Sequence, residues 1–131
     1  MAIINEISLI IGLCLMTAGT FLGAIWANEA WGRYWGWDPK ETWALVTIVV
    51  YVAITHASFI PKLNNPFALS VMSVFGFSTV LMTYLGVNYF LNGLHSYGSG
   101  NAFFELYIFV FIYIFFVAIS ILAYFSYHRI G

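Results

Sequence analysis

The residues that could do chemistry are few in this sequence, and most of them lie in one short segment. Residues 31–43 read WGRYWGWDPKETW, in which four tryptophans and a tyrosine stand among an arginine, an aspartate, a lysine and a glutamate. Outside this tryptophan segment the main candidates are His56, in an apolar run, and His95, in a run of glycine, serine and asparagine. Aromatic faces, cations and imidazoles together suit a flat, anionic ligand that carries a metal.

Heme has these properties, because it is an apolar disc with an iron that needs axial ligands and an edge that bears two carboxylates. We expect noncovalent heme b, with Arg33 and Lys40 near the carboxylates and His95 on the iron. The predicted cofactor-binding residues are Trp31, Gly32, Arg33, Tyr34, Trp35, Trp37, Asp38, Lys40, His95 and His56, of which His95 and His56 would bind heme iron.

The same residues also fit less specific roles. Trp and Tyr concentrate at membrane interfaces in any case. A histidine in a loop such as that of His95 is commonly a surface residue, and His56 could instead bond to a neighbouring helix. Asp38 could serve only as a helix cap. The residue types alone leave these alternatives open.

The composition indicates a membrane protein. Hydrophobic residues make up 63% of the 131 positions and charged residues only 7%, whereas soluble domains carry roughly a quarter charged residues. The net charge of −1 gives no basic field for nucleic acid. Cys14 is the one cysteine, so there is no internal disulfide, no zinc-type cysteine spacing and no Cys-x-x-Cys-His of a c-type cytochrome.

The charged residues divide the chain into four apolar stretches, each about as long as a membrane crossing. We predict an all-α fold, a multi-pass transmembrane bundle whose residues 1–131 form a single membrane domain, with the tryptophan segment between the first and second helices. The N-terminal stretch is read as a retained helix rather than a signal peptide. The expected helices cover about residues 4–26, 39–60, 67–90 and 103–124.

Local signals refine these helices. Asp38, Pro39 and Glu41 predict the start of the second helix, as N-cap, first helical residue and capping-box partner. Trp31 and Trp35 would share one side if their segment were helical. Two stripes of small residues should let helices approach closely. They are Gly19, Gly23 and Ala27 in the first helix and Gly76, Thr79, Thr83 and Gly86 in the third.

Four crossings place the tryptophan segment and His95 on one side of the membrane, and both termini and the Lys62 turn on the other. His56 would lie about 25 Å along the helix from Pro39, at 1.5 Å per residue. It is therefore expected near the opposite face, so that His56 and His95 belong to two separate sites. Lysine and arginine are balanced between the two sides, so charge alone does not fix the orientation.

The order of residues in the tryptophan segment resembles the signature of the WWD family of heme-handling membrane proteins, which includes CcsA (ResC) and CcmC. Trp31-Gly-x-x-Trp35-x-Trp37-Asp38, followed by Pro-Lys-Glu-Thr-Trp43, matches that signature. The extension back to Trp26 and the segment Gly93-Leu94-His95-Ser96-Tyr97-Gly98 are similar to the CcsA branch. The resemblance extends over essentially the whole chain.

The resemblance implies that the tryptophan segment faces the outer side of the membrane and holds heme, with His95 as an external ligand and His56 as a transmembrane ligand. It implies delivery of heme to apocytochrome c together with a CcsB (ResB)-like partner, as part of a holocytochrome c synthase rather than as an enzyme alone. We expect the bacterial plasma membrane rather than the thylakoid membrane.

The chain departs from the family because it corresponds to only the last four helices. Each predicted heme site then has one of its two histidines, and we expect the others in an upstream part of a longer protein rather than in another chain. Two other functions remain open at this point. One is a b-type electron-transfer subunit of a membrane redox complex, and the other is a structural subunit whose aromatic segment docks a partner or lipid.

Overall fold

The computed structural model of this chain describes residues 2–91, 94 and 102–130. Within these ranges the regular structure is entirely helical, and four helical spans are long and apolar enough to cross a membrane. The helices are α1 (Ala2–Trp31), α2 (Pro39–His56), α3 (Pro66–Leu81), α4 (Val87–Phe90) and α5 (Ala102–Ile130). The prediction of an all-α bundle with four membrane spans is therefore confirmed.

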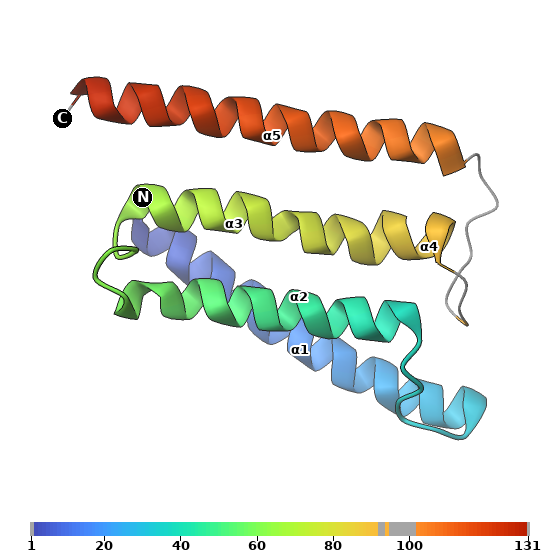
Figure 1. The fold of residues 1–131 in the computed structure, drawn as a ribbon. Coiled ribbons are helices and arrows are strands. Elements are labelled where there is room, and N and C mark those ends of the chain that lie inside the picture. The colour runs from blue at the N-terminus through green and yellow to red at the C-terminus, as the bar shows by residue number, and fades with distance from the viewer. Residues whose placement is uncertain (1, 92–93, 95–101, 131) are drawn as a thin grey trace.

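Figure 1 shows α2, α3 and α5 running alongside one another, with α1 crossing behind α2 and α3. The connection from α1 to α2 and the end of α4 lie at one end of the bundle, and the connection from α2 to α3 lies at the other (Figure 1). The tryptophan segment and residue 94 are thus at the same end. His95 itself lies outside the described residues.

The predicted cap of α2 is confirmed. Asp38 is the N-cap, Pro39 is the first helical residue, and the side chains of Asp38 and Glu41 form a capping box with each other's backbone N–H groups. Each of these side chains accepts hydrogen bonds from N–H groups that a helix start would otherwise leave unpaired. The second helix ends earlier than expected, at His56, and a 3-10 turn, Ala57–Phe59, follows it.

Small residues of the third span pack against α2, as predicted. A Cβ atom added to Gly76 would lie 2.7 Å from the Ile54 Cδ1 atom and 3.3 Å from the Tyr51 ring, so this position leaves room only for glycine. About two turns further on, the Thr83 hydroxyl lies 3.2 Å from the hydroxyl of Thr47, a fully buried residue. These contacts join α2 and α3 along the middle of the bundle.

The third span is not one regular helix. A π-helical turn, Met82–Gly86, joins α3 to α4. Such a turn inserts one extra residue into the helix and so rotates everything that follows it. Val87, directly after the turn, is fully buried, and Asn88 lies within hydrogen-bonding distance of Lys40 on α2. The turn therefore keeps the end of the span in contact with the start of α2.

The glycine stripe of α1 behaves differently from the prediction. A Cβ atom added to Gly19 or Gly23 would meet no atom within 4 Å, whereas Ala27 in the same stripe is 3% exposed. No helix of the described chain packs closely on the two glycines. The stripe leaves open space instead.

α5 is attached through α3 and α4. Aromatic rings make this contact, with the rings of Phe75 and Tyr113 at 6.0 Å and those of Phe77 and Phe116 at 6.3 Å between centroids. Much of the large apolar surface of α1 and α5 is exposed. This surface is suited to lipid, the solvent that such helices require.

Candidate functional site

α1 extends to Trp31, five residues beyond the predicted end, and it stops there because Gly32 has a positive φ of 71°. The Gly32 N–H still donates to the Asn28 carbonyl at 2.8 Å, which is the usual glycine end of a helix. Residues 32–38 are not helical, so the condition under which Trp31 and Trp35 would share one side is not met. Trp31 instead packs edge to face on Trp26, with 5.1 Å between ring centroids.

The rest of the tryptophan segment is held by Glu41. One carboxylate oxygen of Glu41 accepts hydrogen bonds from the backbone N–H of Gly36 at 2.8 Å and of Asp38 at 3.2 Å. Trp37 lies between these two donors with a positive φ of 56°, which is unusual for a bulky residue. The residue Trp37 is 70% exposed, and its ring meets that of Trp35 edge to face, with 5.8 Å between centroids.

Asp38 is the most buried charged side chain of the segment, at 7% exposure. Its Oδ2 atom accepts from the Lys40 N–H at 3.3 Å, within the helix cap. Its Oδ1 atom accepts from the Leu94 N–H at 2.6 Å. Asp38 therefore connects the tryptophan segment to the residue that precedes His95 in the sequence.

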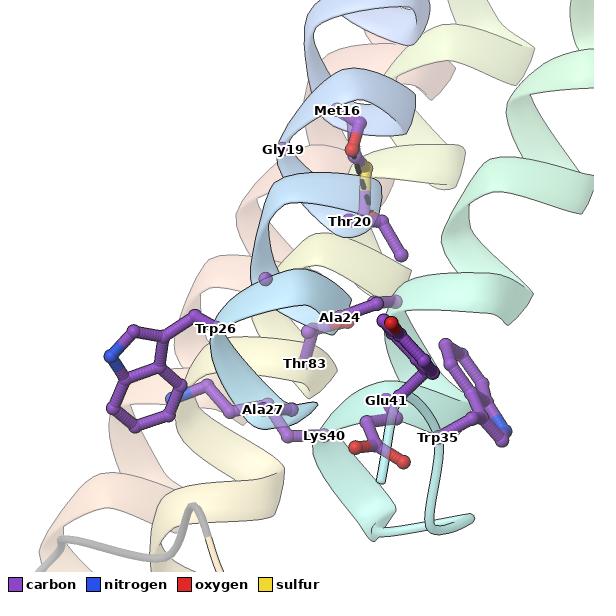
Figure 2. A pocket seen from close by; sticks show the side chains of 13 residues that line it. Met16, Gly19, Thr20, Ala24, Trp26, Ala27, Trp35, Lys40, Glu41 and Thr83 are labelled. Carbon is purple, nitrogen blue, oxygen red and sulfur yellow. Dashed lines mark hydrogen bonds between the residues drawn. The ribbon is translucent and has the colours of Figure 1, made fainter. Parts of the chain in front are cut away.

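A cavity of about 540 Å³ opens beside the segment (Figure 2). This volume is within the range of about 300–1,000 Å³ that is typical of small-molecule sites. α1 provides most of one wall, including the open glycines of its stripe. The lining residues are Met16, Gly19, Thr20, Gly23, Ala24, Trp26, Ala27, Tyr34, Trp35, Lys40, Glu41, Ala44 and Thr83.

A second cavity of about 530 Å³ lies next to the first and is lined almost entirely by apolar side chains. Tyr34 and Trp35 border both cavities, as do Thr20 and Ala24. The rings of Tyr34 and Trp35 are therefore shared by two cavities. The first cavity has charged residues in its lining, and the second has none. A ligand that binds here can contact an aromatic face on either side.

The charged groups of the first cavity are Lys40 and Glu41, which Figure 2 shows near its lower end, with Trp35 beside Glu41. The Lys40 ammonium donates to Asn88 Oδ1 at 3.4 Å. The guanidinium of Arg33 lies against Gly36, where an added Cβ would come within 2.9 Å of it. Arg33 is exposed and is not among the residues that line the cavity.

His56 lies at the opposite end of the bundle, at the last residue of α2. Its Nδ1 atom is 2.8 Å from the Val52 carbonyl oxygen. A carbonyl can only accept, so Nδ1 is the donor in this contact, and Nε2 is the ring nitrogen left for another partner. Histidines that bind metals usually donate their other N–H in this way. Among the described residues, no group of three His, Cys, Asp or Glu side chains could hold a metal ion.

Three of the predicted binding residues, Tyr34, Trp35 and Lys40, come together at the cavity. The same segment contains the other predicted residues, which do not line the cavity: Trp31, Gly32, Arg33, Trp37 and Asp38. The sequence prediction missed the wall that α1 provides, chiefly Met16 and Thr20, and it did not include Trp26 or Glu41 among the binding residues. The glycine stripe was the available signal, but its spacing is the same for a helix contact and for a ligand wall.

Comparison with known proteins gives the family of this chain. Residues 1–95, which include α1 to α4 and the tryptophan segment, match the family model described as "Cytochrome C assembly protein". Protein NrfI of Wolinella succinogenes is 53% identical over 98 residues, which are 75% of this chain and 11% of that protein.

Two proteins named cytochrome c biogenesis protein CcsA are similar as well. The protein of Gloeobacter violaceus is 50% identical over 70% of this chain and 27% of its own length. That of Guillardia theta is 52% identical over 69% of this chain and 30% of its own length. The chain thus spans less than a third of the length of these relatives. With its four membrane spans and its match over residues 1–95, this multi-pass membrane chain belongs to the cytochrome c assembly protein family.

Proposed function

We propose that this chain is the heme-handling part of a cytochrome c assembly protein, and that the cavity beside the tryptophan segment holds heme at the outer face of the membrane. The observation that carries the proposal is the 540 Å³ cavity in which Tyr34, Trp35 and Lys40 meet. Aromatic walls suit the porphyrin faces, and a lysine at the edge suits a heme carboxylate.

The remaining residues have supporting roles in this proposal. Trp31 and Trp37 extend the aromatic surface, each in edge-to-face contact with another tryptophan. Gly32 ends α1 and Asp38 caps α2, so both shape the backbone between the two helices, and exposed Arg33 is a second cation for the heme edge. His95, which follows Leu94 in the chain, is the proposed iron ligand on this side.

His56 is proposed as an iron ligand at the opposite membrane level. Its support is the contact between Nδ1 and the Val52 carbonyl, which leaves Nε2 as the atom that can bind iron. A heme group is too small to reach from this position to the tryptophan segment. Heme would therefore occupy two sites in succession, one at each end of the bundle.

In this proposal the chain is not an enzyme by itself. Heme supplies the iron and the vinyl groups, and this chain holds them near the cysteines of apocytochrome c, which is a proximity role. The proposed partners are apocytochrome c and a CcsB (ResB)-like membrane protein or fused region, within a holocytochrome c synthase. The proposed location is the bacterial plasma membrane, with the tryptophan segment and His95 on the outer face.

The cavity itself provides the test. Gly23 lines the first cavity and has open space at its Cβ position, so Gly23→Leu should fill the cavity without a clash. We expect the purified full-length protein to lose the heme of the outer site, so that total heme in a pyridine hemochrome assay falls while the heme near His56 remains. Leucine suits a helix better than glycine, so the fold should persist. Gly12→Leu is the matched control, because Gly12 is equally open on α1 but lies outside this cavity. Equal heme content in wild type and Gly23→Leu would contradict the proposed site.

A b-type electron-transfer subunit is the alternative function, and the same preparation distinguishes it. Such a subunit would keep its heme through repeated reduction and oxidation and would have no effect on cytochrome c maturation. A heme-handling protein instead transfers its heme, so heme content should fall when apocytochrome c is supplied.

A further inference from the structure

Asp38 uses its two carboxylate oxygens for two different parts of the chain. Oδ2 belongs to the cap of α2, where it accepts from the Lys40 N–H at 3.3 Å. Oδ1 accepts from the Leu94 N–H at 2.6 Å, the shorter of the two bonds. A cap alone needs only one of these oxygens. The second bond therefore has a separate structural consequence, which is to fix the start of the segment that follows α4.

A second polar contact joins the same two regions. The Lys40 ammonium donates to Asn88 Oδ1 at 3.4 Å. Lys40 is two residues after Asp38, and Asn88 is six residues before Leu94. Asn88 can face α2 because the π-helical turn Met82–Gly86 shifts the helical register just before it. The first turn of α2 thus holds both α4 and Leu94.

The hydrogen bond from the Leu94 N–H to Asp38 belongs to a strong class of hydrogen bond. Its acceptor is a carboxylate, and hydrogen bonds to ionised groups are shorter and roughly twice as strong as neutral ones. Asp38 is 7% exposed, so water competes little for its oxygens. A buried carboxylate also favours backbone N–H partners over the carboxylate edge of heme, which it would repel.

We propose that Asp38 is a positioning residue that fixes the backbone at Leu94, the residue that precedes His95 in the sequence. Asp38 acts on heme through the histidine and not by touching it. The significance for heme rests on the function proposed above, in which His95 binds iron. The bond between Asp38 and Leu94 does not depend on that function and is tested separately.

The key variant is Asp38→Asn in the full-length protein. Asparagine caps helices as well as aspartate does, so a residue that only caps α2 would tolerate the change. Its side chain has one oxygen where aspartate has two, so it cannot replace both bonds. We expect amide hydrogen exchange at Leu94, measured without heme, to become about tenfold faster, because a hydrogen bond to a charged group is lost. Asn65→Asp, which changes the cap of α3 at the opposite end, is the control and should leave Leu94 unchanged.

The effect on heme is read from the spectrum of the iron. In Asp38→Asn the proposal predicts loss of the histidine-bound spectrum of the outer site and its recovery when imidazole is added. A general loss of structure would not be repaired by imidazole. Leu94→Pro removes the N–H donor and leaves Asp38 in place, so it should give the same spectrum, and the double variant should be no worse than either single one.

The outcomes separate the two proposals. If exchange at Leu94 is the same in wild type, Asp38→Asn and Asp38→Ala, the positioning role of Asp38 is wrong, whatever the heme results. If exchange at Leu94 rises but the iron spectrum does not change, Asp38 holds Leu94 as described, but this bond does not position the iron ligand, and the proposed consequence for heme is wrong. The role of His95 as a ligand is tested separately by His95→Ala.

Discussion

The carboxylate of Glu41 accepts a hydrogen bond from the backbone N–H of Gly36 at 2.8 Å, across the bend of the tryptophan segment. The same oxygen also accepts from the Asp38 N–H at 3.2 Å. A single side chain on the first turn of α2 thus fixes the backbone on both sides of Trp37. The shape of the aromatic segment depends on this helix start.

Removal of the Glu41 side chain should therefore disturb the segment more than loss of its charge. Glutamine retains an oxygen acceptor and is a normal member of a capping box, so Glu41→Gln should keep the fold and most of the heme affinity. Glu41→Ala should cost about 1 kcal/mol of stability for the lost cap and should weaken heme binding further. Heme titration and thermal unfolding of the two variants in detergent check this. A Glu41→Gln variant as impaired as Glu41→Ala would show that charge, and not the hydrogen bonds, matters.

The contact between α2 and α3 should tolerate no side chain at Gly76. A larger residue must displace Ile54, which is 7% exposed, and the Tyr51 ring. We expect Gly76→Leu to lower the free energy of unfolding by about 1–3 kcal/mol, the usual effect of overpacking. Gly19→Leu adds the same side chain in open space on α1, so its unfolding should stay close to that of wild type. Denaturant unfolding in micelles measures both changes, and equal stabilities would disprove this packing.

The two proposed heme levels should behave independently. Since His56 lies at the end of α2 remote from the tryptophan segment, His56→Ala should reduce the total heme content and leave the spectrum of the outer site unaltered. His95→Ala should also reduce the total heme content, but it should change the spectrum of the outer site and leave the heme near His56 in place. The losses in the double variant should add, as they do for distant sites. Optical spectra of the reduced proteins provide the measurement, and a change at the outer site in His56→Ala would contradict two separate sites.

Thiol labelling should place the tryptophan segment and Leu94 on the same side of the membrane. In a background with Cys14→Ala, cysteines at Trp37 and Leu94, which are 70% and 46% exposed, should react with an impermeant reagent added from the outer side. A cysteine at Lys62, in the turn between α2 and α3, should react only after the membrane is opened. Labelling of positions 37 and 94 from opposite sides would rule out the four-span topology.

Much of this architecture could be predicted from the sequence because it depends on contacts between residues close in the chain and on the burial of apolar stretches in lipid. Long apolar stretches require lipid, and in lipid the backbone must form helices. Asp38, Pro39 and Glu41 specify the start of α2 through contacts within a few residues. The side of the membrane on which the tryptophan segment and residue 94 lie follows from the number of crossings alone.

Tertiary structure decided what the spacing of residues left ambiguous. Gly76 and Gly19 have the same kind of stripe around them, but only Gly76 faces a neighbouring helix, while Gly19 lines a cavity. The π-helical turn and the bond from Asp38 to Leu94 depend on how α4 meets α2, which joins residues far apart in the chain. Periodicity describes one helix at a time, so a pattern can say which residues share a face, whereas only the packed bundle determines whether that face meets a helix, a ligand or lipid.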